Sequence, residues 1–426
     1  MKNNLYSTIK EERALLVMIE LAKEKWPVQS LAQEFKNLVV STGISAQELV
    51  VFKRKEITPS LFIGKGKAQE LAVLVQEKNI NVVIFNNNLS FTQQRNLEEV
   101  FGVKTIDRTQ LILDIFAAHA RTREGILQVE LAQLEYLMPR LAGKGIALSR
   151  LGGGIGTRGP GEKKLEVDRR KIADRIVRLK KEIEGVRQHR LLLRKKRQKE
   201  KVNMCSLVGY TNAGKSTLFN ALTKSEERTA QSLFTTLDTV SRKFAVHNNL
   251  EIVLSDTVGF IYKLPPYLIE SFKATLEELH YADVLLHIID SSSKEISRLL
   301  ESVNSILKEL ELNLKPAILI FNKIDELSGQ QLADLKRQYP DAVFISALRE
   351  MNLNLLNEKI YEGIFGDLIE GLIKVPFNQM AISSFIHNNC EVLKVDYSQG
   401  GVIYLVRITK KNIDFLRKKG VNVKEV

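Results

Sequence analysis

Apolar residues follow two spacings along the chain, and the spacings predict an order of strands and helices. Between residues 13 and 107, short apolar runs typical of buried strands alternate with segments whose apolar residues recur every three or four positions, as in helices. The predicted strands are 14–21, 48–52, 82–85 and 103–106, and the predicted helices are 28–40, 67–78 and 92–101. Alternation of this kind indicates parallel strands. We therefore expect a small parallel α/β subdomain over residues 1–120.

Two long helical patterns follow, separated by glycine. Leucine and methionine recur at alternating spacings of four and three over residues 127–141, and a similar apolar seam runs over residues 165–186. Between them, residues 150–161 contain six glycines and cannot be helical. The pattern predicts an antiparallel helical hairpin over residues 121–200 with a basic, glycine-rich tip. The tip suits contact with RNA phosphates, and a plain flexible linker is the alternative.

The rest of the chain predicts two further domains. Apolar strands at 252–255, 284–289, 317–321 and 342–345 alternate with helical patterns at 267–279, 294–310, 330–338 and 353–364. This predicts a doubly wound α/β sheet over residues 201–366, with its ligand at the carboxyl ends of the strands. Past residue 366, strands at 391–395 and 402–408 and a helix at 413–418 predict a small α/β C-terminal domain, residues 367–426, with no evident catalytic groups.

Composition and charge narrow the class of protein. The chain has 426 residues and is 44% hydrophobic, enough for several folded cores. It shows no leader pattern and no apolar run long enough to span a membrane, which favours a cytoplasmic protein without stable membrane insertion. Its two cysteines, Cys205 and Cys390, are too few for a disulfide framework or a zinc site. Residues 163–201 hold 17 Lys or Arg against 6 Asp or Glu, a stripe that either faces solvent or meets a polyanion.

One glycine-rich motif predicts a phosphate site. Residues 209–217 read Gly-Tyr-Thr-Asn-Ala-Gly-Lys-Ser-Thr and lie between an apolar strand and a helix. The glycines let backbone N–H groups point at a polyphosphate, Lys215 reaches the β and γ phosphates, and the Ser216 hydroxyl can bind Mg²⁺. By contrast, Gly64-Lys65-Gly66-Lys67, before a predicted helix, is equally well a plain loop or an anion site.

Three further motifs follow in the order that a GTPase needs. Asp256-Thr257-Val258-Gly259 ends a strand, which places the Asp256 carboxylate near Mg²⁺ through water and the Gly259 N–H near the γ-phosphate. Asn322-Lys323-Ile324-Asp325 ends another, and the Asp325 carboxylate can accept two hydrogens from the guanine edge, which adenine lacks. Ser346-Ala347-Leu348 fits the loop that donates N–H groups to the guanine carbonyl. Together they predict a Mg²⁺-dependent GTPase.

Two residues bear on switching and rate. Between the phosphate loop and Asp256, a threonine can bind Mg²⁺ only when a γ-phosphate is present, and we assign Thr236 over Thr235. Phe260 follows Gly259, where a glutamine would orient the attacking water, and a phenyl ring cannot do so. We therefore expect slow intrinsic hydrolysis, made faster by a partner or by K⁺ held by the Asn212 carbonyl oxygen.

The expected site residues are as follows. Nucleotide contacts are expected from Gly209, Tyr210, Thr211, Asn212, Ala213, Gly214, Lys215, Ser216, Thr217, Phe234, Thr235, Thr236, Leu237, Asp238, Asp256, Thr257, Val258, Gly259, Asn322, Lys323, Ile324, Asp325, Ser346, Ala347 and Leu348. The catalytic set is Lys215, Thr236 and Gly259, and the metal set is Ser216, Thr236 and, through water, Asp256. The RNA-contact candidates are Arg150, Arg158, Lys163 and Lys164.

Along nearly its whole length the chain resembles the HflX family of ribosome-associated GTPases. The resemblance is carried by Gly64-Lys65-Gly66-Lys67, Ile106-Asp107-Arg108-Thr109 with 111–116, Gln128-Val129-Glu130-Leu131-Ala132-Gln133-Leu134, Gly153-Gly154-Ile155-Gly156 with Arg158-Gly159-Pro160-Gly161-Glu162, and the segments 209–217, 234–238 and 256–260. It implies that the N-terminal domain and its hairpin contact the large ribosomal subunit and its RNA, that GTP binding accompanies association, and that the protein splits stalled or idle ribosomes. The chain departs from the family at Lys163, Ile126 and Thr239, where Thr, Lys and Pro are usual.

The hypothesis is thus a GTP-switched ribosome-binding factor, monomeric off the ribosome. One alternative is a GTPase of ribosome maturation or tRNA modification. A second is a membrane-surface GTPase that lays its basic helix on anionic lipid. The predicted pairing of the two helical seams leaves that helix no free apolar face, which counts against the membrane alternative.

Overall fold

A computed structural model describes residues 12–22, 26–141, 160–199, 202–225, 240–247, 250–263, 278–366, 368–398 and 400–425. By its internal contacts the chain divides into two units, which are described separately here. Unit 1 comprises residues 1–193, 230–238 and 262–274, and unit 2 comprises the remainder. The predicted division into four domains stays a prediction. Among the described residues, no helix combines the length and the apolar character that crossing a membrane requires.

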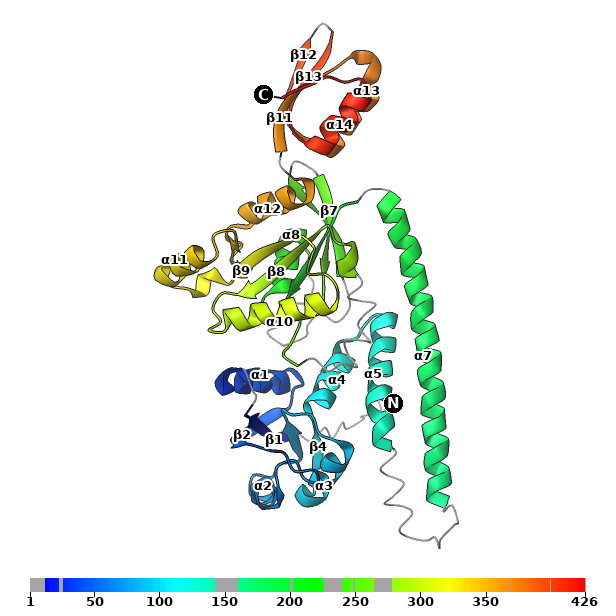
Figure 1. Cartoon of the computed structure of the whole chain (residues 1–426), viewed down its shortest axis with the longest axis vertical. Helices are drawn as coiled ribbons and strands as arrows, with labels where there is room; N and C mark the ends of the chain where they lie inside the picture. The colour runs from blue at the N-terminus through cyan, green and yellow to red at the C-terminus, as the bar shows by residue number, and fades with distance from the viewer. Residues whose placement is uncertain are drawn as a thin grey trace, which may run out of the picture. The chain divides into compact units, whose positions relative to one another are not determined.

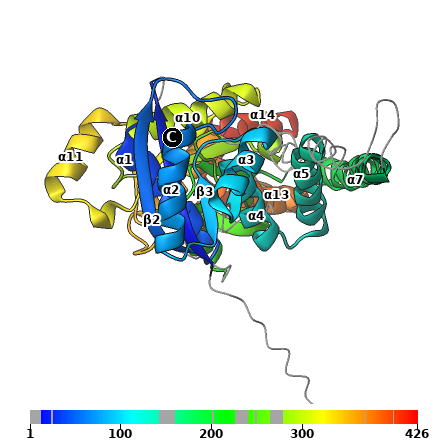
Figure 2. The same ribbon diagram turned by 90° about the horizontal axis from the view of Figure 1, so that it is seen from below.

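Unit 1 contains a parallel four-stranded sheet in the order β2-β1-β3-β4. Its leucines and valines alternate between the two faces, and Leu15, Val17 and Val83 pack against α2 and α3. Helices α1 and α4 lie over the opposite face (Figure 1, Figure 2). The elements are β1 (Arg13–Leu21), α1 (Val28–Ser41), β2 (Ser45–Arg54), α2 (Lys65–Glu77), β3 (Val82–Phe85), α3 (Phe91–Phe101), β4 (Lys104–Ile106) and α4 (Arg108–His119). The parallel α/β arrangement predicted for this region is confirmed.

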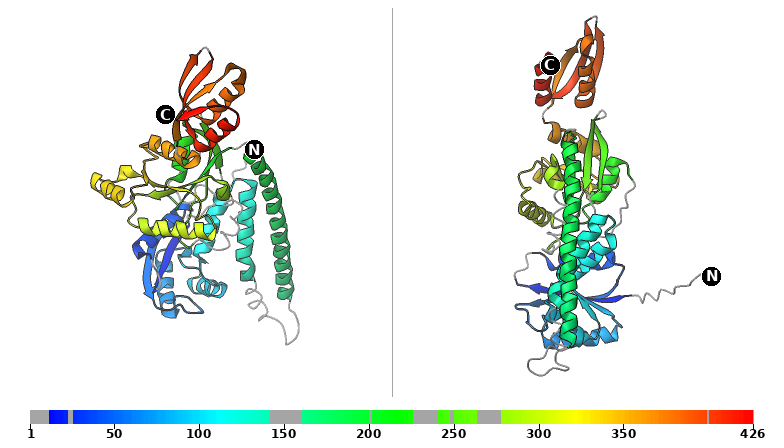
Figure 3. Two further views of the ribbon diagram at one scale, coloured as in Figure 1. Left: turned by 45° about the horizontal axis from the view of Figure 1, so that its top comes forward. Right: turned by 90° about the vertical axis from the view of Figure 1, so that its right-hand side faces the viewer.

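The two long helices of unit 1 pair along the predicted seam. They are α5 (Arg123–Leu141) and α7 (Pro160–Lys199), which run side by side in Figures 1 and 3. Their shared core contains Leu127, Leu131, Ile176 and Leu179. The ion pairs show that the helices are antiparallel: Arg123 meets Glu182 at 3.9 Å, and seven residues further along α5, Glu130 meets Arg175, seven residues back along α7, at 2.7 Å.

Unit 2 contains a six-stranded sheet in the order β10-β9-β8-β5-β7-β6. Neighbouring strands are parallel except at the edge, where β6 pairs antiparallel with β7. One face packs against α8 and α12, and the other packs against α10 and α11. The elements are β5 (Met204–Gly209), α8 (Lys215–Thr223), β6 (Val240–His247), β7 (Leu250–Asp256), β8 (Val284–Asp290), α10 (Ile296–Glu309), β9 (Ala317–Asn322), α11 (Gly329–Gln338), β10 (Val343–Phe344) and α12 (Leu353–Phe365). This is the doubly wound fold that the sequence predicts; the pattern missed β6, and residues 267–277 of the predicted helix 267–279 lie outside the described residues.

Unit 2 also contains an antiparallel four-stranded sheet in the order β12-β13-β11-β14. Helices α13 and α14 contribute Ile386, Ile413 and Leu416 to its core. The elements are β11 (Leu368–Val375), α13 (Met380–Asn389), β12 (Glu391–Ser398), β13 (Gly401–Thr409), α14 (Lys410–Lys418) and β14 (Val423–Glu425). The predicted pairing of β12 with β13 is present, whereas β11, α13 and β14 carried no clear pattern in the sequence.

Candidate functional site

The glycine-rich segment forms a tight turn between β5 and α8. Strand β5 is buried throughout, so the turn emerges from the middle of the sheet. A Cβ on Gly209 would lie 2.3 Å from the Ile288 carbonyl oxygen, and one on Gly214 would lie 2.2 Å from Asn322 Nδ2. Only glycine fits at these two positions, because real Cβ atoms do not approach other atoms so closely. The turn thus packs directly against the ends of β8 and β9.

Lys215, the first residue of α8, is buried beneath this turn. Its ammonium donates to the carbonyl oxygens of Gly209 at 3.2 Å and Tyr210 at 2.8 Å. Burial lowers the pKa of Lys215 to about 8, and the nearby Asp256 carboxylate opposes that shift. A cation held by neutral carbonyl groups at the start of a helix is poised to bind a phosphate.

Asp256 ends β7 and lies beside α8. Its Oδ2 accepts a 2.8 Å hydrogen bond from Ser216 Oγ, and its residue is only 2% exposed. A hydroxyl and a carboxylate oxygen are the hard ligands that Mg²⁺ prefers, so the described part of the predicted metal set fits this ion. The structure therefore brings together Ser216 and Asp256, which are forty positions apart in the sequence.

The segment after Asp256 is joined by backbone hydrogen bonds to the turn that is predicted to bind phosphate. Phe260 N–H donates to the Gly209 carbonyl at 3.1 Å, and Thr211 N–H donates to the Phe260 carbonyl at 2.7 Å. The Phe260 side chain is buried, at 2% exposure, and supplies no hydrogen-bonding group. Gly259 lies so close that a Cβ there would be 2.9 Å from Lys215 Nζ. A movement of this segment would therefore also move the turn.

Asn322, at the end of β9, joins three loops. Its Nδ2 donates to the Ala213 carbonyl at 2.9 Å, and its Oδ1 accepts from Ala347 N–H at 2.9 Å. Asp325 follows on a short 3₁₀ turn with its residue exposed, free of the apolar core. Ser346 and Ala347 are buried, whereas Leu348 is exposed. The predicted base-binding segments and the turn predicted to bind phosphate therefore all lie at the carboxyl ends of the parallel strands.

Comparison with known proteins identifies the family. Family models match residues 29–117 (GTP-binding GTPase N-terminal), 119–197 (GTP-binding GTPase Middle Region) and 204–323 (50S ribosome-binding GTPase). The chain is 42% identical to GTPase HflX of Caldanaerobacter subterraneus subsp. tengcongensis, over 94% of this chain and 91% of that protein. It is 43% identical to GTPase HflX of Escherichia coli, over 86% of each. The chain belongs to the HflX family of GTPases.

A solved structure is also similar to this HflX-family chain. It is a GTP-binding protein of Sulfolobus solfataricus in complex with GDP, 26% identical, covering 83% of this chain and 98% of that one, with a TM-score of 0.45. The family assignment is carried by the sequence relatives and the family models, which together cover the N-terminal, middle and nucleotide-binding regions.

Several predicted residues of this HflX chain lie outside the described residues. They are Phe234, Thr235, Thr236, Leu237, Asp238, Arg150 and Arg158, together with Thr239. Lys163 and Lys164 lie in the first turns of α7. The described site therefore contains the phosphate, Asp256 and base-binding segments, and roles for the others stay predictions.

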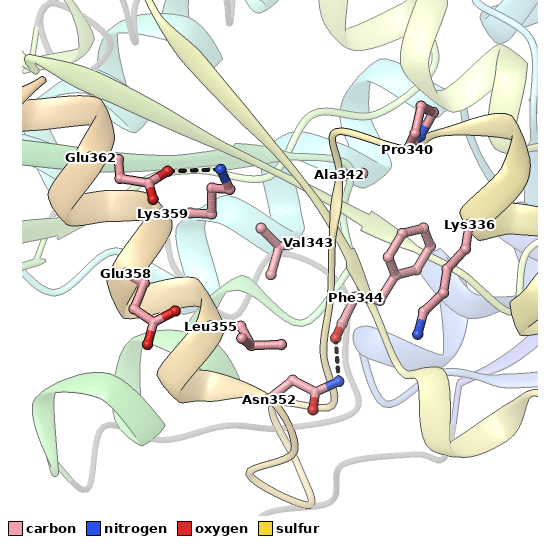
Figure 4. Close-up of a pocket in the computed structure, with 10 residues that line it drawn as sticks. All are labelled: Lys336, Pro340, Ala342, Val343, Phe344, Asn352, Leu355, Glu358, Lys359 and Glu362. Carbon is pink, nitrogen blue, oxygen red and sulfur yellow. Dashed lines mark hydrogen bonds and ion pairs between the residues drawn. The ribbon is translucent and has the colours of Figure 1, made fainter. Parts of the chain in front are cut away.

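A separate pocket of unit 2 lies between α11, β10 and α12 (Figure 4). Phe344, Val343 and Leu355 line it, together with the alkyl chain of Lys336. Three of its lining side chains make contacts within the wall: Asn352 Nδ2 donates to the Phe344 carbonyl at 2.8 Å, and Lys359 meets Glu362 at 2.7 Å. None of its lining residues belongs to the predicted nucleotide set, so this pocket is distinct from the HflX nucleotide site.

Two residues at the end of β8 contact the base-binding segment although no motif includes them. Asp290 pairs with Lys323 at 2.5 Å, and Ser291 donates two hydrogen bonds to the Asn322 carbonyl. The sequence did hold a signal. A buried strand that ends in Asp-Ser, next along the chain to the strand that ends in Asn-Lys, predicts that the two ends meet at one sheet edge.

Proposed function

We propose that this protein is a Mg²⁺-dependent GTPase that binds the large ribosomal subunit in its GTP-bound state and splits ribosomes. The observation that carries the proposal is that Lys215, Asp256 and Asn322 lie together at the carboxyl ends of the parallel strands. The region that contains Lys215, Asp256 and Asn322 matches a family model described as a 50S ribosome-binding GTPase. Convergence at the carboxyl ends of parallel strands is where doubly wound sheets bind nucleotides.

The phosphate groups are proposed to lie over the turn between β5 and α8. Lys215 holds the β and γ phosphates, and Gly259 N–H contacts the γ-phosphate. Ser216 and Thr236 would bind Mg²⁺ directly and Asp256, 2.8 Å from Ser216 Oγ, would hold it through a water; the ion when bound neutralises charge on the β and γ oxygens. Asn212 extends at the exposed side of the turn with a positive φ of 62°, where its carbonyl oxygen is available to K⁺.

The base is proposed to lie between the Asn322-Lys323-Ile324-Asp325 and Ser346-Ala347-Leu348 segments. Asp325 accepts from guanine N1 and N2, and a carboxylate left without those donors would discriminate against adenine. Asn322 serves the site indirectly, because its two hydrogen bonds fix the phosphate-binding turn and the Ala347 segment to each other.

Hydrolysis is proposed to be slow until a partner completes the site. The side chain of Phe260 is buried and has no group that can hydrogen-bond to a water. Phe260 therefore does not orient the attacking water. Because Phe260 is bonded by its backbone to the phosphate-binding turn, a ribosome that moves this segment would change the position of Gly259 as well.

The paired helices α5 and α7 are proposed to contact ribosomal RNA. Arg169, Arg170, Lys171, Arg178 and Lys181 are exposed along α7, while the apolar seam of α7 is covered by α5. A buried seam with cations on the outward side suits contacts with phosphate groups. Arg150, Arg158, Lys163 and Lys164 would add charge at the tip of the hairpin.

Sucrose-gradient co-sedimentation with intact ribosomes and with separated subunits tests the proposal. We expect migration with the large subunit, and loss of the intact-ribosome peak, with a non-hydrolysable GTP analogue and not with GDP. Asp334→Asn, a change on the exposed face of α11, is the matched control and is expected to behave as wild type. Absence of migration in either nucleotide state would refute the ribosomal role, and preferential migration with a subunit precursor would favour ribosome maturation instead.

A further inference from the structure

The end of β8 forms hydrogen bonds with the Asn322–Asp325 segment, which is proposed to bind the base. In the register of the sheet, Asp290 lies beside Asn322. Asp290 Oδ2 accepts from Lys323 Nζ at 2.5 Å, and Asp290 Oδ1 accepts from the N–H of Ser292 at 2.9 Å and its hydroxyl at 2.7 Å. Both carboxylate oxygens are therefore engaged, and Ser292 fixes the direction in which Asp290 faces Lys323.

Ser291 supports the same peptide from its other side. Its N–H, at 2.9 Å, and its hydroxyl, at 2.6 Å, both donate to the Asn322 carbonyl oxygen. Ser291 is only 3% exposed, so water does not compete for these bonds. The Asn322 carbonyl and the Lys323 side chain are thus held by two consecutive residues, Asp290 at the end of β8 and Ser291 directly after it.

The peptide needs this support because Lys323 has an unusual backbone conformation. Its φ is +67°, in the left-handed region that residues other than glycine adopt only at a cost in free energy. Its side chain is 23% exposed and that of Asp290 is 20% exposed, so their attraction is only partly screened by solvent. The ion pair with Asp290 therefore acts on the residue whose backbone conformation is the unfavourable one.

We propose that Asp290 is a positioning residue for guanine recognition. By holding the Lys323 ammonium, it keeps Lys323 in the left-handed conformation, which sets the direction of the chain between Asn322 and Asp325. The inference rests on the proposed function, because it requires that this segment binds the base. If Asp290 only stabilised the ends of β8 and β9, replacing it would lower the GDP affinity by the same factor whether or not Lys323 was present.

Fluorescence titration of the full-length protein with a labelled GDP tests the proposal. Asp290→Asn keeps the shape and removes the charge, and we expect about tenfold weaker binding, the change that corresponds to about 1.4 kcal/mol. Asp290→Glu is expected to recover part of the affinity, and Ser292→Ala, which frees the carboxylate to turn, is expected to weaken binding about threefold. Asp334→Asn is the control for the loss of an aspartate charge and is expected to bind as wild type. The maximal hydrolysis rate at saturating GTP is expected to stay within about twofold, since Asp290 lies on the base side of the site.

A double-mutant cycle with Lys323→Met separates positioning from stability. If Asp290 acts through Lys323, then Asp290→Asn will cost nothing further, within about twofold, when Lys323 is already methionine. An equal loss in both backgrounds, or an unchanged affinity in Asp290→Asn and Ser292→Ala alike, would overturn the proposal. A wild-type protein that fails to bind GDP would instead refute the proposed function, so the two failures are distinguishable. Should Asp290→Asn fail to melt cooperatively, Asp290→Glu and Ser292→Ala decide the matter in the same cycle.

Discussion

Ser216 Oγ and Asp256 Oδ2 are 2.8 Å apart, a hydrogen bond that joins the start of α8 to the end of β7. Ser216 can donate this hydrogen bond to Asp256 and still offer a lone pair of its hydroxyl oxygen to Mg²⁺, which Asp256 would hold through a water. A metal ion at this place would therefore require little rearrangement of the protein.

We predict that removing Mg²⁺ weakens GTP-analogue binding by the wild type about tenfold or more. The Ser216→Ala variant is expected to bind the analogue weakly even with Mg²⁺ present, and its affinity is expected to change little when Mg²⁺ is chelated. The reason is that the alanine variant lacks one of the oxygens that hold the ion. Titrations with and without EDTA measure both effects, with Asp334→Asn as control. A Ser216→Ala protein that keeps the full Mg²⁺ response would contradict the assigned ligand.

Gly209 provides a prediction about stability. Alanine at this position would place its Cβ 2.3 Å from a backbone oxygen of β8, which no side-chain rotation relieves. We predict that Gly209→Ala lowers the free energy of unfolding by about 3 kcal/mol or prevents folding. Gly329→Ala, where a Cβ meets nothing within 4 Å, is the matched control and is expected to be neutral or stabilising in thermal and denaturant unfolding. Equal stability of the two variants would contradict the packing described here.

The parts of the fold that the sequence predicted are those whose pattern is local. The apolar runs of β5 and β8 and the seam shared by Leu131 and Leu179 follow from residue spacing alone, and the structure confirms both. Strand β6 was missed because its Arg242 and Lys243 are exposed at a sheet edge, and the alternation of a half-exposed strand is weak over a short stretch.

The candidate site, like the fold, has parts that the sequence predicts and parts that it does not. The motifs around Lys215, Asp256 and Asn322 have fixed residue types at fixed spacing, so their place at strand ends could be predicted. For Asp290 and Ser291 the order of strands indicates only that they lie near the Asn322 segment, because their individual hydrogen bonds depend on the register between β8 and β9, which is a non-local property. Likewise, the close approach of Gly214 to Asn322 is visible only once both strands are placed.

We predict that Lys215 gives the nucleotide affinity a pH dependence. In the nucleotide-free protein its pKa is lowered to about 8 from 10.5, mainly by burial. Below pH 8 the ammonium is charged and can bind phosphate; above it the charge is lost, so GDP affinity is predicted to fall about tenfold per pH unit. The sign for stability is opposite: a depressed pKa in the folded state means that this group adds stability as pH rises from about 8 to 10.5.

The measurement for Lys215 is GDP titration and thermal unfolding between pH 6.5 and 9.5. Lys215→Arg, which stays charged throughout, is predicted to remove the bend in affinity near pH 8. Constant GDP affinity of the wild type up to pH 9.5 would show that Lys215 is not the phosphate-binding cation.

The helix pair of unit 1 is predicted to depend on its apolar seam more than on its ion pairs. Leu179 is fully buried between α7 and α5, so Leu179→Ala should cost about 2 to 4 kcal/mol. Glu130 pairs with Arg175, but these side chains are 37% and 40% exposed, so Glu130→Gln should cost at most about 1 kcal/mol. Denaturant unfolding of both variants measures the difference. A larger cost for Glu130→Gln would show that charge, rather than apolar packing, holds the hairpin together.

The exposed cations of α7 make the proposed ribosomal contact sensitive to salt. Each phosphate that a Lys or Arg neutralises releases counterions, so the logarithm of the association constant should fall linearly with the logarithm of salt concentration. Arg169 and Lys171 are both exposed on α7. We predict that Arg169→Glu with Lys171→Glu weakens binding to the large subunit and reduces that slope by about 1.4 to 1.8, since roughly 0.7 to 0.9 is lost per phosphate contact. Lys418→Glu with Lys419→Glu, the same charge change on exposed residues of the C-terminal sheet domain, is the control and should leave the slope unchanged. If both pairs lower the affinity equally, the effect comes from net charge alone, and α7 does not face ribosomal RNA.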